Sequence, residues 1–166
     1  MTALARFRAE KDAYFREGPN SPVEDATFPG LLYYPPSEAH VVMAALEPMK
    51  AREVSLLATS TGDEQPYLRV ARAMFELGGQ PCALTLFRPT FGDSQRFFIP
   101  FQDATSGTQT YAAGRYLEAD LLPDGRVLLD FNYAYAPFCA YSARYRCPLP
   151  PAENRLPVPV YAGERL

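Results

Sequence analysis

Two carboxylates, Glu118 and Asp130, have the spacing most suggestive of chemistry, because a predicted turn brings them together. Residues 123–125 are Pro-Asp-Gly, a sequence typical of a type I turn with a glycine bulge, which pairs Leu122 with Arg126. In that register Glu118 lies opposite Asp130, and facing carboxylates repel unless a cation or a shared proton offsets the charge. The pair is therefore interpreted as a solvated acidic patch, a cation site or an acid/base pair. A shift of one residue in register would separate it.

Arg115 is expected on the opposite, apolar face of this hairpin, together with Leu117 and Phe131. A buried guanidinium needs an acceptor. We therefore expect Arg115 either to reach solvent at the rim or to pair with a nearby carboxylate or an anionic ligand. Asp103 is the candidate carboxylate.

A loop rich in hydroxyl side chains, residues 103–111, precedes the hairpin. Short hydroxyl side chains usually cap backbone groups locally, and the same groups could bind a polar ligand. The loop does not have the calcium-binding pattern of an EF-hand, because Thr105, Gly107 and Gly114 stand where that pattern requires carboxylates.

Common catalytic and metal-binding motifs are absent from the sequence. It has no phosphate-binding glycine loop, nucleophile elbow or zinc pattern, and no metal site is predicted. A cysteine nucleophile would depend on His40, the one histidine, for its base. Cys82 alternates with leucines and is expected in the core. Cys139 and Cys147 are eight positions apart and could bridge if the chain folds back, although reduced thiols are expected in a cytoplasmic protein.

The elements that must position these residues follow from composition and pattern. The chain has 166 residues, of which 48% are apolar, enough for one domain with a sizeable core. The formal net charge is −3 and basic residues are scattered, so no stripe is present that would neutralise nucleic-acid phosphates. No apolar run approaches the roughly 20 residues of a membrane span, and the N-terminus lacks the apolar stretch of a signal peptide. We therefore expect a cytoplasmic protein that binds neither nucleic acid nor membrane.

One N-terminal helix is predicted within residues 1–18. Thr2 is a suitable N-cap, and Gly18-Pro19 would end the helix. Apolar residues recur on one face at helical spacing, and this narrow stripe is expected to lie over an open end or a face of the sheet. The stripe comprises Leu4, Phe7, Tyr14 and Phe15, whereas Arg6, Arg8, Glu10 and Asp12 are expected on other faces.

From residue 28 onward the pattern changes to strands. The 17 prolines argue against many long helices, and the 11 Tyr and 11 Phe residues suit strands. Short turns separate eight candidate strands, and Gly78-Gly79 is typical of a two-residue hairpin turn. This regular spacing favours an antiparallel barrel or sandwich of about eight to nine strands, in a β core spanning residues 28–136. The candidate strands are 31–34, 40–46, 53–59, 67–77, 82–88, 95–101, 112–122 and 126–133.

The last part of the chain, residues 137–166, is rich in proline and favours extended backbone. We expect it to pack along the domain as a strap. Leu156, Val158 and Val160 alternate as they would in an edge strand. No linker divides the chain, so residues 1–166 are predicted to form a single domain.

A set of short motifs is distributed along nearly the whole chain: Phe28-Pro29-Gly30-Leu31, Tyr33-Tyr34, Phe98-Ile99-Pro100-Phe101, Asp103, Thr105-Ser106-Gly107, Thr110-Tyr111, Gly114-Arg115-Tyr116-Leu117, Asp130-Phe131-Asn132, Ala134-Tyr135, Cys139-Ala140-Tyr141, Cys147-Pro148-Leu149-Pro150-Pro151, Glu153-Asn154 and Ala162-Gly163-Glu164. This set resembles a family of uncharacterised bacterial and archaeal proteins, the domain of unknown function DUF1684. The family pattern has an Asn where this chain has Ala136, so any ligand role of that amide is absent here.

The resemblance implies no activity. It does imply that ten polar residues lie in one spatial constellation and form the candidate ligand site. They are Asp103, Thr105, Ser106, Thr110, Tyr111, Arg115, Asp130, Asn132, Tyr135 and Glu153.

Three functions are compatible with these residues. The first is a binding module that takes a small anionic or hydroxylated ligand, with Arg115 supplying charge and other polar residues orienting the ligand. The second is a hydrolase or isomerase that uses Glu118 and Asp130, or Asp103, as an acid/base pair. In the third, the motif residues only hold the strap on the barrel. The sequence identifies no cofactor and does not decide whether the protein is an enzyme. In the first of these functions, the binding module, the polar residues expected to orient the ligand are Asp103, Asn132, Tyr135 and Thr110.

Overall fold

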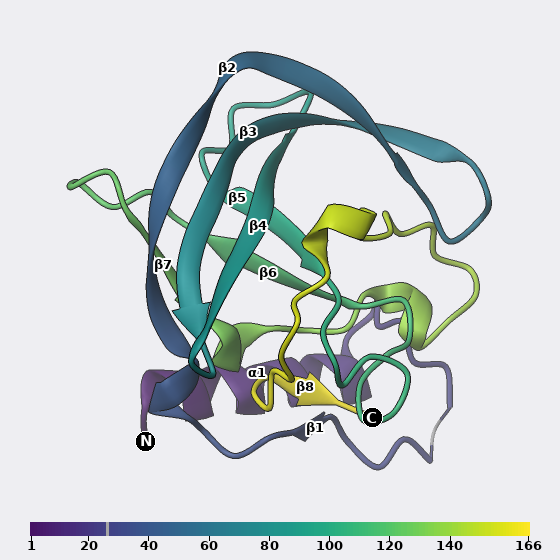
Figure 1. Ribbon diagram of the computed structural model, residues 1–166. Helices are drawn as coiled ribbons and strands as arrows, with labels where there is room; N and C mark the ends of the chain where they lie inside the picture. The colour runs from purple at the N-terminus through teal and green to yellow at the C-terminus, as the bar shows by residue number, and fades with distance from the viewer. Residues whose placement is uncertain (26) are drawn as a thin grey trace.

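The computed structural model describes residues 1–25 and 27–166, and of residues 50–52 it describes the backbone alone. Within these residues the chain forms one α-helix, eight strands and four short 3-10 helices (Figure 1). The main elements are α1 (Ala3–Glu17), β1 (Leu32–Tyr33), β2 (Val41–Ala58), β3 (Glu64–Leu77), β4 (Gln80–Pro89), β5 (Phe97–Phe101), β6 (Arg115–Ala119), β7 (Val127–Asp130) and β8 (Glu164–Arg165). The 3-10 helices are Glu38–His40, Phe131–Tyr133, Phe138–Ala140 and Ala152–Asn154.

Six strands form one antiparallel sheet in the order β6-β5-β4-β3-β2-β7. The outer strands, β6 and β7, are consecutive in the chain and meet near their turn through a bridge between Leu121 and Val127. The sheet therefore curls into a nearly closed barrel, while β1 and β8 form a second, two-stranded sheet (Figure 1). The prediction of a mostly β protein, with an antiparallel barrel and one N-terminal helix, is confirmed.

The β2 strand differs from its prediction, because the structure has one strand where two were expected. It runs without interruption from Val41 to Ala58. Its pairing with β3 shifts register between Pro48 and Glu53, and this irregularity accommodates a proline, which cannot donate to the ladder. The hairpin at Gly78-Gly79 is confirmed, since both residues have positive φ angles (60° and 75°) that favour glycine.

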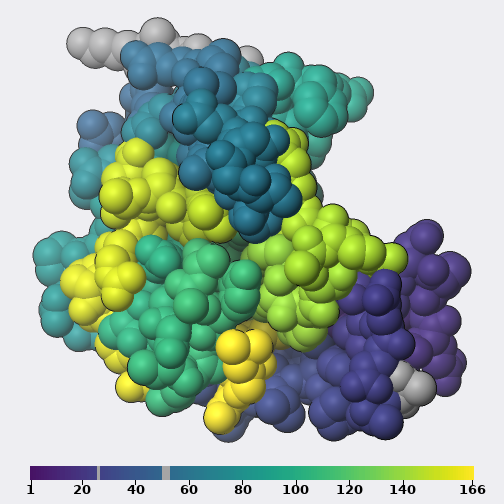
Figure 2. All heavy atoms as spheres, turned by 90° about the vertical axis from the view of Figure 1, so that its right-hand side faces the viewer, coloured from purple at the N-terminus to yellow at the C-terminus, as the bar shows by residue number. Residues whose placement is uncertain are grey.

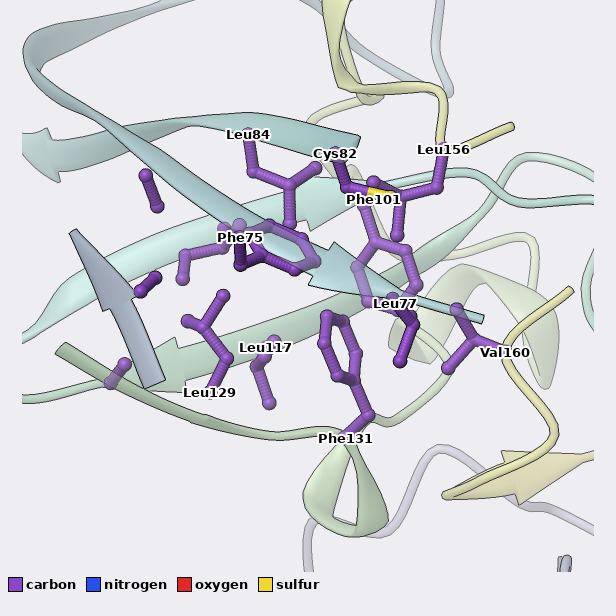
Figure 3. Packing of buried hydrophobic residues seen from close by; sticks show 14 of the residues in the cluster. Phe75, Leu77, Cys82, Leu84, Phe101, Leu117, Leu129, Phe131, Leu156 and Val160 are labelled. Atoms are coloured by element: carbon purple, nitrogen blue, oxygen red, sulfur yellow. The ribbon is translucent and has the colours of Figure 1, made fainter. Parts of the chain in front are cut away.

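The barrel interior is filled by residues that alternate along its strands. Phe75, Leu117, Leu129 and Phe131 point into this interior (Figure 3). Further buried residues come from the C-terminal strap, residues 137–166: Leu156, Val158, Val160 and Ala162 all belong to the same core.

The strap packs along the domain and adds no strand to the six-stranded sheet. It runs alongside the chain just after β5, where Leu156 donates its backbone N–H to the carbonyl of Gln102 (2.8 Å). Its alternating apolar residues thus close one end of the barrel, because the sheet itself supplies no cover there. Figure 2 shows the strap, in yellow-green to yellow, beside the green loop of residues 103–111.

The helix α1 has the predicted cap, with Thr2 accepting the backbone N–H of Ala5 (3.1 Å), and lies across one end of the barrel (Figure 1). Arg8, which was expected on another face, and Lys11 both face the domain. Arg8 donates to the carbonyl of Tyr34 (3.0 Å), and Lys11 pairs with the buried carboxylate of Glu164. Buried acceptors therefore orient this helix as much as its apolar stripe does. None of the helices in the described ranges has the length and apolar character needed to cross a membrane.

Candidate functional site

Arg115 lies at the closed end of the barrel and is 1% exposed. One side of its guanidinium donates to the carboxylate of Asp103, at 3.2 Å between Nη2 and Oδ2. Its Nη1 and Nη2 atoms also donate to backbone carbonyls of the strap, which lie between 2.5 and 3.0 Å away. Burial lowers the pKa of Arg115, and the carboxylate of Asp103 opposes this shift. The carbonyls belong to Val160, Ala162 and Glu164.

Asp103, the acceptor expected from the sequence, is itself fully buried. Its Oδ2 atom also accepts the backbone N–H of Val160 (2.6 Å), and its Oδ1 atom accepts the hydroxyl of Thr105 (2.7 Å). Ser106 donates its hydroxyl to the same oxygen at 3.3 Å, and the hydroxyls of Thr105 and Thr110 lie 3.0 Å apart. The hydroxyl side chains of the loop thus bind one another and a carboxylate of the same loop.

Asp130 and Asn132 form a second group beyond β7. The side chain of Asn132 accepts the backbone N–H of Ser37 and donates to the carbonyl of Ser37, both at 2.9 Å. It also donates to Oδ1 of Asp130 (2.9 Å). This clamp joins the turn after β7 to the segment that leads into β2.

Glu153 lies on the side of the barrel formed by β3 and β4. Its carboxylate accepts two hydrogen bonds from Arg69, at 2.6 and 2.5 Å, and one from the hydroxyl of Thr85 (2.6 Å). The neighbouring Asn154 bonds backbone groups of Thr85 and Pro100, at 2.7 to 2.9 Å. These contacts fasten the strap to β4 and β5.

The ten residues of the predicted spatial constellation are not joined by one hydrogen-bond network. Five of them, Arg115 included, are linked through Asp103, whereas the other five lie outside this network. The reason is that the motifs fasten different parts of the chain to the barrel. The five residues at the closed end are Asp103, Thr105, Ser106, Thr110 and Arg115.

A groove opens on the outside of the barrel between β6, β7 and α1. Near the turn, Leu122 donates its N–H to the carbonyl of Arg126 (2.8 Å), as the predicted register requires. Further along, β6 pairs with Tyr135 rather than with β7, so the prediction that Glu118 lies opposite Asp130 in a hairpin is wrong. Glu118 and Asp130 consequently line one hollow of about 370 Å³. Its other walls include Phe7, Asp120, Tyr133 and Tyr135.

A second hollow, of about 420 Å³, continues along α1. Phe7, Glu118 and Tyr135 line both hollows, so the two adjoin, and together we call them the helix groove. Phe7 is 37% exposed because it forms a wall of this groove instead of packing into the barrel. Sequence reasoning missed the role of Phe7, although the narrowness of the helical stripe was a signal that part of it stays uncovered.

Negative charge predominates in the first hollow, where Glu118, Asp120 and Asp130 face one cation, Arg96. Arg96 lies 3.5 Å from Glu118 and 3.2 Å from Asp120. Tyr135 donates its hydroxyl to Glu118 (3.2 Å). Burial, reinforced by this carboxylate, raises the pKa of Tyr135 well above its usual range, so its hydroxyl remains a donor at all ordinary pH values.

Aromatic faces complete the helix groove. The rings of Phe7 and Tyr133 meet edge to face, with centroids 5.0 Å apart. The ammonium group of Lys11 lies 4.6 Å from the centroid of the Tyr135 ring, which shows that this face accommodates a cation. The arrangement of aromatic faces beside carboxylates can bind a positively charged group on an apolar body.

Comparison with known proteins gives a family and a fold. Residues 26–165 match the model of a protein family of unknown function, DUF1684. The chain is similar to an uncharacterised protein of Haloarcula marismortui, whose structure was solved by NMR in solution. The two are 40% identical, with a TM-score of 0.78, and the match covers 98% of this chain and 92% of that one. A comparison with functionally curated proteins gives no match.

Proposed function

The chain belongs to the DUF1684 family, a family of unknown function, and we propose that it is a small-molecule-binding β-barrel whose ligand lies in the helix groove. One observation carries this proposal: two adjoining hollows share Phe7, Glu118 and Tyr135 and together present aromatic faces beside carboxylates. Largely apolar concave sites with a few convergent polar groups are typical of small-molecule sites.

The ligand class follows from the charge and the walls of the groove. Three carboxylates face a single guanidinium in the first hollow, so a positive group is favoured and an anion is repelled. The rings of Phe7 and Tyr133 suit both an apolar body and a cation held over a ring face, whereas the Tyr135 ring already carries the ammonium group of Lys11. We therefore propose an organic amine with an apolar or aromatic body.

Arg115 was expected to supply the charge of the site. In this proposal it has a structural role and does not contact the ligand. Its donors already bind Asp103 and three strap carbonyls, so an anionic ligand would have to displace the strap. Catalysis by the carboxylate pair is ranked below binding. The Glu118 side chain is 42% exposed, which suits exchange of a bound ligand more than chemistry that requires water to be excluded.

Charge-matched probes provide the test. Phenethylamine, phenethyl alcohol and 3-phenylpropionate share an aromatic body but differ in charge, and their binding to the full chain is measured by calorimetry or by ligand-observed NMR. We expect the amine to bind most tightly and the carboxylate most weakly. Glu118→Gln should weaken amine binding, whereas Glu76→Gln, which alters an exposed carboxylate on β3, should leave it unchanged.

Native mass spectrometry of gently purified protein complements these probes. A mass that is lost on denaturation and is absent from Glu118→Gln would identify the natural ligand. The proposal is wrong if 3-phenylpropionate binds as well as phenethylamine, or if amine binding is indifferent to Glu118.

A further inference from the structure

Cys139 and Cys147 meet because the chain folds back between them. The 3-10 helix Phe138–Ala140 leads into a turn in which Ser142 donates its N–H to the carbonyl of Phe138 (3.0 Å). After this turn the Sγ atom of Cys147 accepts the backbone N–H of Cys139, at 3.3 Å. The chain therefore folds back between the two cysteines, as a disulfide between them requires.

Cys139 has two titratable neighbours, the thiol of Cys147 and the hydroxyl of Tyr111. Burial, followed by the proximity of Cys139, raises the pKa of Cys147 to about 11 and that of Tyr111 to about 12. The remaining cysteine, Cys82, is buried in the barrel core and belongs to a different part of the fold.

We propose that Cys139 and Cys147 are a thiol-oxidation site that closes reversibly to an intramolecular disulfide, with a low-molecular-weight disulfide such as oxidised glutathione as the oxidant. Two thiols are oxidised and one glutathione disulfide is reduced to two glutathione thiols. The two protons released by the cysteines are taken up by the two glutathione thiolates, so the exchange is balanced.

Exposure gives the order of the two steps. Cys139 is partly exposed, whereas Cys147 is buried. The thiolate of Cys139 therefore attacks the sulfur of oxidised glutathione first, forming a mixed disulfide and releasing one glutathione thiolate. Cys147 then attacks the sulfur of Cys139, which breaks the mixed disulfide and releases the second glutathione thiolate.

The bridge would lock a segment that holds the β2–β3 hairpin. Ser60 donates its N–H to the carbonyl of Cys147 (2.9 Å), and Arg146 lies 2.7 Å from the carboxylate of Asp63. Figure 2 shows the tip of this hairpin, in blue, against the yellow-green segment. A crosslink that closes so short a loop raises the melting temperature of a domain of this size by roughly 5–10 °C.

The test compares the products of oxidation. The fully reduced native chain is incubated with oxidised glutathione, quenched with acid, alkylated and analysed by intact mass and peptide mapping. We expect a loss of two hydrogens, a link between Cys139 and Cys147, and an alkylated Cys82. The oxidised chain should melt at the higher temperature, and reduction should reverse the change.

Variants separate the steps. Cys147→Ser should retain glutathione on Cys139, because no second thiol is present to displace it. Cys82→Ser should form the bridge like the natural sequence. The proposal is overturned if the natural chain keeps all three thiols, stops at the mixed disulfide, or forms a bridge that includes Cys82 or a second chain.

Discussion

At the scale of single residues, Arg115 is the clearest example of a charge whose partners are all supplied by the protein. It is buried beside Asp103, and its other donors bind carbonyls 45 to 49 positions further along the chain. Removing one member of a buried ion pair leaves the other charge uncompensated, which costs far more than the net stabilisation by the pair.

Arg115→Met should therefore lower the free energy of unfolding by about 3–5 kcal/mol. Asp103→Asn in the same chain should recover part of that loss, because it removes the unpaired charge. Urea denaturation of both variants measures the effect. Arg126→Met is the control, since Arg126 and its partner Asp124 are both about half exposed and should contribute little. Equal midpoints for Arg115→Met and the natural chain would refute a structural role.

At the scale of elements, the strap is held to the barrel by polar contacts at two places, residues 153–154 and residues 160–164. Asn154 bonds the backbone of β4 and β5, Glu153 bonds Arg69 on β3, and the carbonyls from residues 160–164 bond Arg115. The strap therefore depends on polar contacts as well as on its buried apolar residues.

The ion pair of Glu153 with Arg69 makes strap attachment sensitive to acid. The hydrogen bonds from Arg69 hold the pKa of Glu153 below its ordinary value of 4.5, with burial opposing and Thr85 assisting. A lowered pKa in the folded state stabilises the protein above pH 4.5, and this stabilisation disappears as the pH falls through the folded-state pKa.

We expect Glu153→Gln to lower the free energy of unfolding by up to about 1 kcal/mol at pH 7, since the pair is partly exposed. The difference from the natural chain should be smaller at pH 3, because protonation of Glu153 removes its charge. Urea midpoints at the two pH values measure this, with Glu76→Gln as the matched control. A difference that is the same at both pH values would contradict the argument.

At the scale of the whole molecule, the helix groove exists only because α1 docks against the barrel. Phe7 comes from the helix, Glu118 from β6 and Tyr135 from the segment after β7. None of these elements alone forms a concave surface.

Phe7→Ala should weaken phenethylamine binding roughly three- to tenfold, the loss expected for one aromatic face next to a cation. Because Phe7 is partly exposed, the urea midpoint should change little. Calorimetry and denaturation of the same preparation distinguish the two effects. Unchanged affinity would exclude Phe7 from the ligand site.

Much of the fold was predictable because its signals are local. The Thr2 cap, the Gly78-Gly79 turn and the hairpin register all depend on residues a few positions apart. The single long β2 strand was not predictable in the same way, because a proline usually interrupts a strand. Here the register shift against β3 accommodates Pro48, and that shift is a property of the pair of strands.

The sequence by itself determined the helix, most of the barrel strands, the turn that brings Leu122 to Arg126, and the need of Arg115 for an acceptor. Only the tertiary structure decided which acceptors Arg115 receives, that the strap closes the barrel, and that Phe7 forms a wall of the groove. The physical reason is distance along the chain. Caps and turns are set by neighbouring residues, whereas a buried charge or a concave surface is made by segments that meet only after folding.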